Sequence, residues 1–499
     1  MFTTRTTAVG LGSRLDPNHY SPEAVALDQA LWKLGSQPIH TIVNPNRKIT
    51  NGVRGPALQP SKFKLVRLQD CRDWEVMFQD CLTISEAQFV ENRRCRLQRD
   101  DVIVAIGGYL GNAAIVSEHG EAVIGQHSAL LPFGHSTGND PRYVVAYLNS
   151  SYGAIQFSRW SRGTVQAGLN LEDIADIAIP LADPVAQAYI GNKVRQAEGL
   201  RAVARTLTTS AERYFAGLHS RSIDGWRGSW RRRAHVLAEG RLDAWFYATA
   251  PTKLERGLSA SGASPVGKRV KAVRKNSFDA NRSIQYFEIG NVDTATGCVW
   301  PREVAPDLIP SRAKRSVRTW DILVSTVRPE RKNIALVGPG CEGQLVASSG
   351  FSVLRATSPQ EAAFICWFLR SDAATDQLLR WNTGATYPAI EDDVPLNVLM
   401  PKYRDTEVEY HGTQWMKIPN LLSTASNLTA AARFLVEALI EQKVTETDLI
   451  AAHKSPDADR ALLARLTQKG LDIPDADPLF PDLDRLEELL IEAQAEGGE

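Results

Sequence analysis

The residues in this chain with the clearest chemical potential are short clusters of arginine and lysine. Their cationic groups can neutralise phosphates, and arginine can also hydrogen-bond to base edges in the major groove of a duplex. We therefore treat the clustered residues as candidates for binding a polyanion, together with one tyrosine in a glycine-rich turn. The candidates are Arg93, Arg94, Arg96, Tyr109, Lys268, Arg269, Arg274, Lys275, Arg328, Arg331 and Lys332.

The charge distribution favours the same chemistry in the second half of the chain. The net charge is zero, but residues 261–333 contain 14 basic and 7 acidic residues. Residues 445–499 contain 5 basic and 14 acidic residues, so this tail is not expected to meet the same phosphates. A solvated protein face explains each composition equally simply, and this alternative stays open for every cluster.

Motifs for catalysis are missing from the sequence. It contains no phosphate-binding loop, no Asp/Asn-Pro-Pro-Tyr/Phe motif of amino-methyltransferases and no His-Glu-x-x-His metal motif. The stretch Gly107–Gly111 lacks the dinucleotide-binding spacing and is interpreted as a tight turn between strands. His127 is interpreted as a buried imidazole that has a hydrogen-bond partner. The pattern therefore predicts a binding protein with no catalytic residues and no metal site.

The cysteines and the apolar runs indicate the cellular compartment of the protein. Six cysteines lie far apart without a Cys-x-x-Cys pair, which favours reduced thiols over a zinc site or a disulfide framework. No run of about 20 apolar residues is present, and the first ten residues do not resemble a secretory signal. We expect a cytoplasmic protein.

Matching segments indicate an internal duplication. The clearest pairs are Arg14-Leu15-Asp16 with Arg241-Leu242-Asp243, Asp101-Val102-Ile103-Val104 with Asp321-Ile322-Leu323-Val324, Gly163 with Gly384, and Pro180 with Pro401. The members of the last three pairs are 220 or 221 residues apart, and we call this separation the repeat offset. Markers that keep their order at a nearly constant offset predict two similar units, which could bind the two parts of a two-part target.

Each unit is predicted to begin with a mixed α/β body. Short runs rich in Val, Ile and Ala predict strands, and apolar residues at helical spacing predict a helix after them. The predicted strands are 101–105, 113–116, 122–124 and 174–179 in the first copy, and 321–326, 333–337, 344–347 and 394–400 in the second. The predicted helices are 141–150 and 360–371.

A long helix is predicted after each body. The first begins at Asp183-Pro184, where an acidic N-cap precedes a proline in the first helical position, and the second is expected to begin near Pro419. Seam residues alternate in steps of four and three, as in a coiled coil, and small alanines among them permit close approach. A single amphipathic helix against a globular core is the alternative. The larger seam residues are Leu200, Leu207, Leu218, Leu421, Leu428 and Leu435.

The predicted fold class is α+β, with two similar mixed α/β bodies separated by a pair of long antiparallel coiled-coil helices. The bodies are expected over residues 1–182 and 225–403. The first spacer helix is expected over 183–224, and a linker with the second spacer helix over 404–445. Residues 446–499 are expected to form an acidic helical extension. Its last helix is expected to carry Leu483, Leu486, Leu489 and Leu490, and it either docks a partner or packs on the coiled coil.

As an ordered set that occurs twice, these segments resemble the specificity (S) subunit of type I restriction–modification systems, over roughly residues 10–445. The segments that carry the resemblance are Asp101–Gly111, Gly125–Leu130, Gly163–Asn170 and Ile177–Pro180 in the first copy, and Asp321–Pro329, Ala347–Phe351 and Gly384–Ile390 in the second.

The resemblance implies two target recognition domains, each reading one half of a split DNA sequence. It also implies that the paired helices fix the gap between the halves and dock two DNA-methyltransferase subunits, which a restriction (motor) subunit can join in phage defence. The family's specificity subunit is not an enzyme, so S-adenosylmethionine and ATP are expected only on the partner subunits. The basic candidates then become DNA-binding residues.

Two other functions are alternatives. A non-catalytic protein-interaction scaffold of a related anti-phage defence complex would explain the duplication equally well, although the basic excess in the second body disfavours it. A salt titration of DNA binding would separate the two functions, because phosphate contacts make affinity fall steeply with salt. A methyltransferase or nuclease fused to recognition domains is disfavoured, because no segment is left with the necessary size or motifs.

Overall fold

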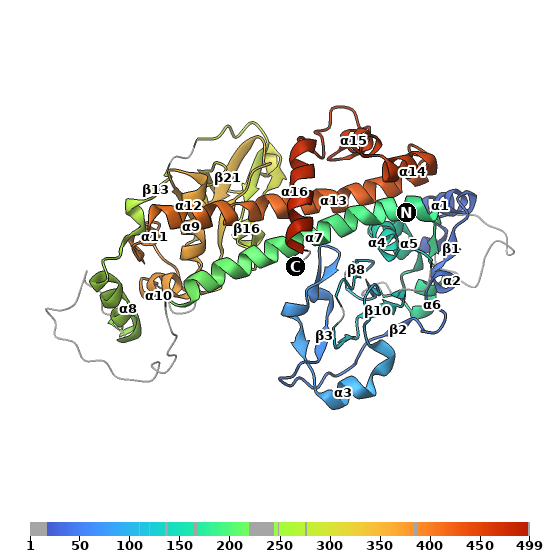
Figure 1. The fold of residues 1–499 in the computed structure, drawn as a ribbon, viewed down its shortest axis with the longest axis horizontal. Coiled ribbons are helices and arrows are strands. Elements are labelled where there is room, and N and C mark those ends of the chain that lie inside the picture. The colour runs from blue at the N-terminus through green and yellow to red at the C-terminus, as the bar shows by residue number, and fades with distance from the viewer. Residues whose placement is uncertain are drawn as a thin grey trace. The chain divides into compact units, whose positions relative to one another are not determined.

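The computed structural model describes residues 17–108, 110–118, 120–134, 138–162, 168–218, 244–247, 249–274, 277–383 and 387–497. Contacts within the chain divide it into two units. The first unit contains residues 1–200 and 424–499, and the second contains residues 201–423. In each unit, sheets of short strands are accompanied by helices, and long helices connect the two units in the chain (Figure 1).

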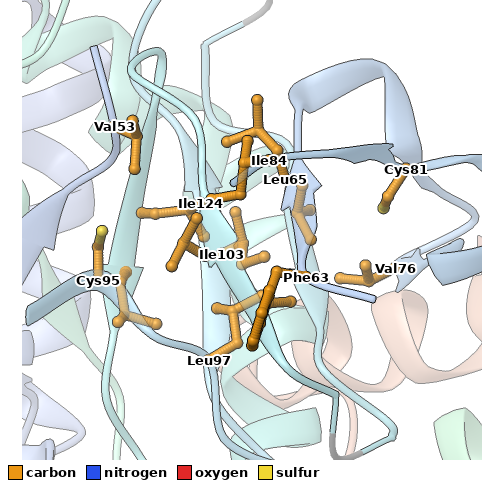
Figure 2. Packing of buried hydrophobic residues seen from close by; sticks show 14 of the residues in the cluster. Val53, Phe63, Leu65, Val76, Cys81, Ile84, Cys95, Leu97, Ile103 and Ile124 are labelled. Carbon is orange, nitrogen blue, oxygen red and sulfur yellow. The ribbon is translucent and has the colours of Figure 1, made fainter. Parts of the chain in front are cut away.

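The first unit is built on a six-stranded sheet with a three-stranded sheet beside it. The six strands lie in the order β2 (Thr50–Asn51), β10 (Ser128–Leu131), β7 (Val102–Ala105), β8 (Ala113–Ile115), β5 (Glu75–Val76) and β4 (Cys71–Arg72). The smaller sheet has the order β6 (Leu82–Thr83), β3 (Lys64–Val66) and β9 (Ala122–Ile124), with β3 and β9 parallel. Figure 2 shows the apolar cluster of this unit, where Phe63, Leu65, Ile103 and Ile124 pack together.

The helices of the first unit include one that is buried on every side. All eight residues of α4 (Pro141–Leu148) are buried, and Asp140 caps its first turn. The remaining elements of the body are η2 (Pro17–Tyr20), α1 (Pro22–Lys33), α2 (Ile39–Ile42), η3 (Leu68–Asp70), η4 (Phe78–Asp80), α3 (Glu86–Glu91), η5 (Arg93–Cys95), α5 (Ser151–Trp160) and α6 (Leu171–Ala175), with a short antiparallel pair between β1 (Gln37–Pro38) and β11 (Ala178–Ile179).

The second unit has a six-stranded sheet of the same construction. Its order is β13 (Lys271–Ala272), β22 (Phe351–Arg355), β19 (Ile322–Ser325), β20 (Ile334–Val337), β16 (Cys298–Val299) and β15 (Val292–Asp293). A four-stranded sheet has the order β17 (Arg302–Val304), β14 (Ile284–Phe287), β21 (Gln344–Ser348) and β18 (Ala313–Ser316). β14 and β21 are parallel, as β3 and β9 are in the first unit.

The remaining elements of the second body are mostly helical. The α-helices are α8 (Thr249–Ala260), α9 (Pro359–Leu369), α10 (Asp372–Arg380) and α11 (Val394–Asn397). The 3-10 turns are η8 (Ala244–Tyr247), η9 (Val266–Lys268), η10 (Ile289–Asn291), η11 (Pro306–Leu308) and η12 (Pro329–Arg331). A short pair between β12 (Ser264–Pro265) and β23 (Leu399–Met400) corresponds to the β1–β11 pair of the first unit.

Equivalent backbone details confirm that the two sheet-rich regions are similar. Asp100 and Trp320, one residue before the aspartates that precede the central strands, both adopt a positive φ, of 67° and 70°. The main-chain nitrogen of each donates to the carbonyl of a valine, Val116 or Val337, at 2.8 Å. Both the donors and the acceptors of these two bonds are related by the repeat offset of the sequence markers.

The long helices follow the bodies as predicted, but the second begins earlier than expected. α7 (Pro184–Ala216) starts at the predicted proline, and α13 (Lys417–Ile440) starts close to Pro419. The segment expected as a linker before it forms α12 (Asp405–Trp415) instead. Since Asp405 follows Pro184 at the repeat offset, α12 and α13 together correspond to α7.

Three further local expectations were wrong. His127 is exposed, because it lies in the turn between β9 and β10, where its ring contacts the Gln126 amide at 2.9 Å. The strands expected over 174–179 and 394–400 are confined to their last residues, as β11 and β23. The residues before them form helical turns that end α6 and make up α11, because Asn170 and Asp173 form a capping box and Pro395 suits the first turn of a helix.

The C-terminal extension folds onto the helices of the first unit. It consists of α14 (Glu446–Lys454), α15 (Pro456–Ala464), the hairpin of β24 (Leu466–Thr467) and β25 (Gly470–Leu471), and α16 (Leu483–Gly497). Leu486 and Leu489 on α16 are buried, which agrees with the alternative that this helix packs against the rest of the chain. Asp459 on α15 accepts hydrogen bonds from Tyr189 and Lys193 of α7, both at 2.7 Å.

All six cysteines are free thiols. Burial raises the pKa of Cys71, Cys81, Cys298 and Cys366 to about 12, so these thiols are protonated near neutral pH. Within the described ranges, no helix combines the length and the apolar composition that a membrane crossing requires.

Candidate nucleic-acid interface

Three basic candidates of the first body lie on or next to η5. Arg93 and Arg94 are exposed, with their side chains available to solvent. Arg96 is half-buried and donates two hydrogen bonds to the carbonyl oxygen of Phe89, at 3.1 and 2.9 Å. Its guanidinium also lies over the Phe89 ring, 4.1 Å from the centroid. Arg93 and Arg94 are therefore better placed than Arg96 to meet a polyanion, and Tyr109 lies outside the described residues.

In the second body, the segment Tyr387–Asp393 brings together three arginines that are distant in sequence. The main-chain nitrogen of Arg328 donates to the carbonyl of Pro388 at 2.7 Å. Arg315 forms an ion pair with Asp392, and Arg274 forms one with Asp393 at 2.6 Å. Arg274 and Asp393 are both more than half exposed, with 68% and 54% of their side chains accessible. Such a pair is worth little and is readily exchanged for a phosphate.

Arg328 is held in an unusual conformation at the end of β19. Its φ and ψ of 51° and 62° lie in the left-handed region, which is uncommon for a residue with a Cβ atom. Pro329 follows it and starts η12, and the Arg328 guanidinium lies over the ring of Tyr387 at 4.7 Å. Tyr387 is 63% exposed. The turn therefore presents a stacked arginine and tyrosine, a pair suited to contacting a nucleic-acid base.

The other candidates of the second body differ in how far they are already engaged. Lys268 and Arg331 are exposed. Lys332 forms an ion pair with Asp372 at 2.8 Å. Arg269 bridges Glu361 and Asp405, and although burial lowers its pKa, the hydrogen bonds to these carboxylates outweigh the burial and raise it. Arg269 thus joins α9 to α12, and Lys275 lies outside the described residues.

The first body pairs the same two turns in the same way. The main-chain nitrogen of Leu169 donates to the carbonyl of Ile106 at 3.0 Å, as Ile390 donates to Thr326 at 2.9 Å. Gly168 forms β-bridges with Gly107 and Arg162, and Ala389 forms them with Val327 and Thr383. In both bodies, the turn after the central strand therefore lies against the loop that follows the second helix of the body.

The exposed basic segments also occupy equivalent places. Arg94 and Lys314 are related by the repeat offset, and both are exposed just before the central strand of their sheet. Lys314 belongs to the basic cluster Arg312-x-Lys314-Arg315 of the sequence, whereas Tyr387 was not among the predicted candidates. The repeat offset points to Lys314, since it aligns Arg94 with that residue. Tyr387 had no comparable signal beyond its place in the Gly384–Ile390 marker.

The arrangement suits binding and orientation of an anionic ligand. The described residues hold no group of three or more His, Cys, Asp and Glu side chains placed to bind a metal ion. In the second body, the turn at Arg328 and the loop at Tyr387 provide a fixed backbone, cationic side chains and an aromatic ring.

Comparison with known proteins identifies a protein of similar sequence. No family model matches the sequence. The chain is 24% identical over 240 residues to the type I restriction enzyme EcoBI specificity subunit of Escherichia coli. The match covers 46% of this chain and 49% of that protein, so it spans about half the length of the curated relative. The predicted resemblance to a type I specificity subunit is thereby confirmed at the level of sequence.

Solved structures of this kind were also found. The S subunit of the type I restriction–modification system from M. genitalium is 11% identical, with a TM-score of 0.41, over 82% of this chain and 96% of that one. The HsdS subunit from Thermoanaerobacter tengcongensis is 13% identical, with a TM-score of 0.28, over 82% of this chain and 97% of that one.

Proposed function

We propose that this chain is the DNA specificity subunit of a type I restriction–modification complex. The observation that carries the proposal is the duplication, in which two bodies with the same strand order present the same pair of turns. A protein that reads two separate half-sites needs two such surfaces on one chain. The sequence similarity to the EcoBI specificity subunit supports the same function.

In this proposal, residues 1–182 and 225–403 are the two target recognition domains. In the second domain, Arg328 with Tyr387 is the base-reading candidate, because its backbone is fixed on both sides of the turn. Lys268, Arg274, Arg331 and Lys332 supply phosphate contacts, together with Lys275. In the first domain Arg93 and Arg94 take the same part, and Tyr109 is a further candidate from the sequence. Arg96 and Arg269 hold the fold and contribute less.

The spacer of the complex is proposed to be α7 paired antiparallel with α12–α13 as a coiled coil. The buried stripes support this pairing. Leu421, Leu428 and Leu435 on α13 are buried, as are Leu200, Ala204 and Ala211 on α7. Leu207 and Leu218 are half-buried. The same helices are proposed to dock two DNA-methyltransferase subunits, and a restriction subunit can join them.

The chain is proposed to be non-catalytic, with S-adenosylmethionine and ATP bound by its partners. The test is co-expression of the chain with its methyltransferase subunit, followed by sequencing of methylated DNA. We expect one bipartite motif, and we expect that exchanging residues 225–403 for those of a relative changes only one half of it. If both halves change, or if the motif is continuous, the two-domain interpretation is wrong.

A second measurement separates DNA recognition from a scaffold role. Binding of the purified full chain to a duplex that carries the motif should weaken steeply as salt is raised. The same preparation should transfer no methyl group to that duplex until the methyltransferase subunit is added. Salt-independent binding would favour the protein-interaction scaffold, and turnover by the chain alone would contradict the non-catalytic role.

A further inference from the structure

In each body, the buried helix after the sheet meets the spacer helix at a glycine. In the first unit, the N-terminus of α4 lies against Gly191 of α7. A Cβ atom built on Gly191 would lie 2.4 Å from Oδ2 of Asp140. In the second unit, the N-terminus of α9 lies against Gly412 of α12. A Cβ atom there would lie 2.2 Å from the main-chain oxygen of Gln360. The two glycines are related by the repeat offset, so they are equivalent positions of the duplication.

The first of these joints continues along one face of α7. The side chains of Gln187, Arg195 and Glu198 lie on the same face as Gly191 at helical spacing. Gln187 accepts a hydrogen bond from the main-chain nitrogen of Asp140 at 3.1 Å, and Arg195 pairs with the Asp140 carboxylate at 2.8 Å. Glu198 forms a bidentate pair with the buried Arg142 at 2.9 and 2.8 Å. The body is therefore fixed to the helix by directional contacts over three turns.

The second joint is made from different side chains. Arg269 bridges the first turns of α9 and α12 through Glu361 and Asp405. Beyond Gly412, the ring of Trp415 stacks on Phe364 of α9, with centroids 5.6 Å apart. Because this joint is largely aromatic and the first is ionic, the glycine is the feature that the two joints have in common.

Glycine is not needed in α7 for helix formation. It weakens a helix relative to alanine, so a glycine in the middle of a long helix calls for a reason. Gly199 lies in the same helix, and a Cβ atom there would meet nothing within 4 Å. Gly191 differs in that another element occupies the space where its side chain would be.

We propose that Gly191 and Gly412 are positioning residues that fix the orientation of each recognition body on its spacer helix, and thereby the gap between half-sites that the protein accepts. The DNA consequence rests on the function proposed above. A methyl group at Gly412 must move α9 away from the helix by roughly 1 Å, because it meets main-chain atoms and close-packed interiors hold no spare volume. At Gly191 it must displace either the body or the Asp140 carboxylate, which caps α4 and pairs with Arg195. The turns that contact DNA would move with the body, while their own residues stay unchanged.

The first test concerns Gly191. A methyl group there would clash with the Asp140 side chain, which can be removed by mutation. The full chain is compared with Gly191→Ala, Asp140→Gly, the double variant and Gly199→Ala as the matched control. Affinity is measured for duplexes that carry the methylated motif with its native gap, and with gaps one base pair shorter and longer. Thermal unfolding is measured in parallel to detect loss of fold.

We expect Gly191→Ala to reduce the preference for the native gap by about tenfold. Gly199→Ala should keep the preference of the unmodified chain. Asp140→Gly also removes the Arg195 pair, so it is the reference for the double variant. The double variant should match this reference, because the clashing carboxylate is gone and glycine is tolerated as an N-cap. Uniform weakening at all three gaps, or failure of the double variant to match Asp140→Gly, would overturn the positioning role. If Gly191→Ala does not fold, the comparison of the double variant with Asp140→Gly shows whether the carboxylate causes the clash, and Gly412→Ala tests the gap preference.

The second test uses Gly412, where the obstacle is backbone and no side-chain change can relieve it. Gly412→Ala should alter the gap preference at least as strongly, while methylome sequencing returns the same bases in both half-sites. Gly257→Ala on α8, with nothing within 4 Å of the added methyl group, is its control. An unaltered gap preference would overturn the proposal. Absence of any bipartite binding by the unmodified chain would instead refute the proposed function.

Discussion

Replacing Asp459 with alanine should destabilise the first unit by about 2–3 kcal/mol, because it leaves a buried ammonium group without its partner. Lys193 lies on α7 with 4% of its side chain exposed, and its Nζ is 2.7 Å from Asp459 Oδ1. Burial lowers the pKa of Lys193, which marks the cost of holding its charge there. Tyr189 also donates to the same carboxylate oxygen and would lose that acceptor.

The magnitude follows from how far each partner is buried. Removing one partner of a fully buried ion pair costs about 3–5 kcal/mol, whereas an exposed pair is worth about 0–1 kcal/mol. The lysine is almost fully buried, but 30% of the aspartate side chain is exposed, so the value should fall between these limits and nearer the first. For a unit of this size, the melting temperature should fall by roughly 3–5 °C.

The assay is thermal and urea unfolding of the full chain. Asp457→Ala is the matched control, since Asp457 lies in the same first turn of α15 but is exposed. Adding Lys193→Met to Asp459→Ala should recover most of the lost stability, because the unpaired charge is removed. If Asp459→Ala and Asp457→Ala differ by less than about 0.5 kcal/mol, the acidic extension is not an integral part of the first unit and the reasoning fails.

Four further changes test other parts of the molecule. Arg328→Ala should weaken binding of the bipartite target by about 1–3 kcal/mol if the arginine reads a base, whereas Lys275→Ala should weaken all sequences equally and flatten the salt dependence by about one unit of slope; filter binding over a salt series distinguishes the two. Burial lowers the pKa of His411 against the opposing effect of Glu407, so the stability that its neutral ring contributes is present above about pH 6.5 and is lost as the pH falls toward the folded pKa. His411→Phe should therefore reduce the fall in melting temperature between about pH 7.5 and 5.5, and an unchanged fall would contradict this. Inserting four residues after Ala204 adds about 6 Å of helix and should lengthen the unread gap in the methylated motif, leaving both half-sites the same.

The strands were predictable because their information is local. Runs such as Val102–Ala105 and Ile334–Val337 are apolar throughout and end at turns, and their residues are all buried. The parallel pairing of β3 with β9 was not predictable, since Lys64 and Ala122 are brought together only by tertiary folding. The repeat was the strongest signal of the domain organisation, because finding it requires only a comparison of the sequence with itself and no propensity scale.

The helix α12 was missed because its pattern contains little apolar surface. Its buried residues are Val408, Gly412 and Trp415, spaced correctly for one helical face but including a glycine. The repeat offset, which relates Pro180 to Pro401, would have placed a helix start at Asp405. On α7, the polar residues Arg201 and Thr208 are also buried. A search for leucine heptads does not find such positions.

The candidate interface was predicted in composition but not in arrangement. Clusters of arginine and lysine were expected to be exposed, and Arg93, Arg94, Lys268, Arg274 and Arg331 are exposed, whereas Arg269, Arg328 and Lys332 are half-buried. The carboxylates that meet Arg274, Arg315 and Lys332 lie between 40 and 119 residues away in sequence. Charge counts along the chain cannot reveal such pairs, because they depend on which loops the fold brings together.

The two copies retain positions rather than side chains, and this determines what can be exchanged between relatives. Asn149 ends α4 and bonds both main-chain atoms of Ala113, while Arg370 ends α9 and donates to the carbonyl of Ile334 at 2.9 Å. Both members of the two pairs are related by the repeat offset, so the same helix end contacts the same strand through different chemistry. The contacts between each body and the long helix after it have diverged in the same manner, ionic in one copy and largely aromatic in the other. Each sheet-rich body is therefore matched to the first turns of the helix that follows it, and the natural unit of exchange is the body together with those turns.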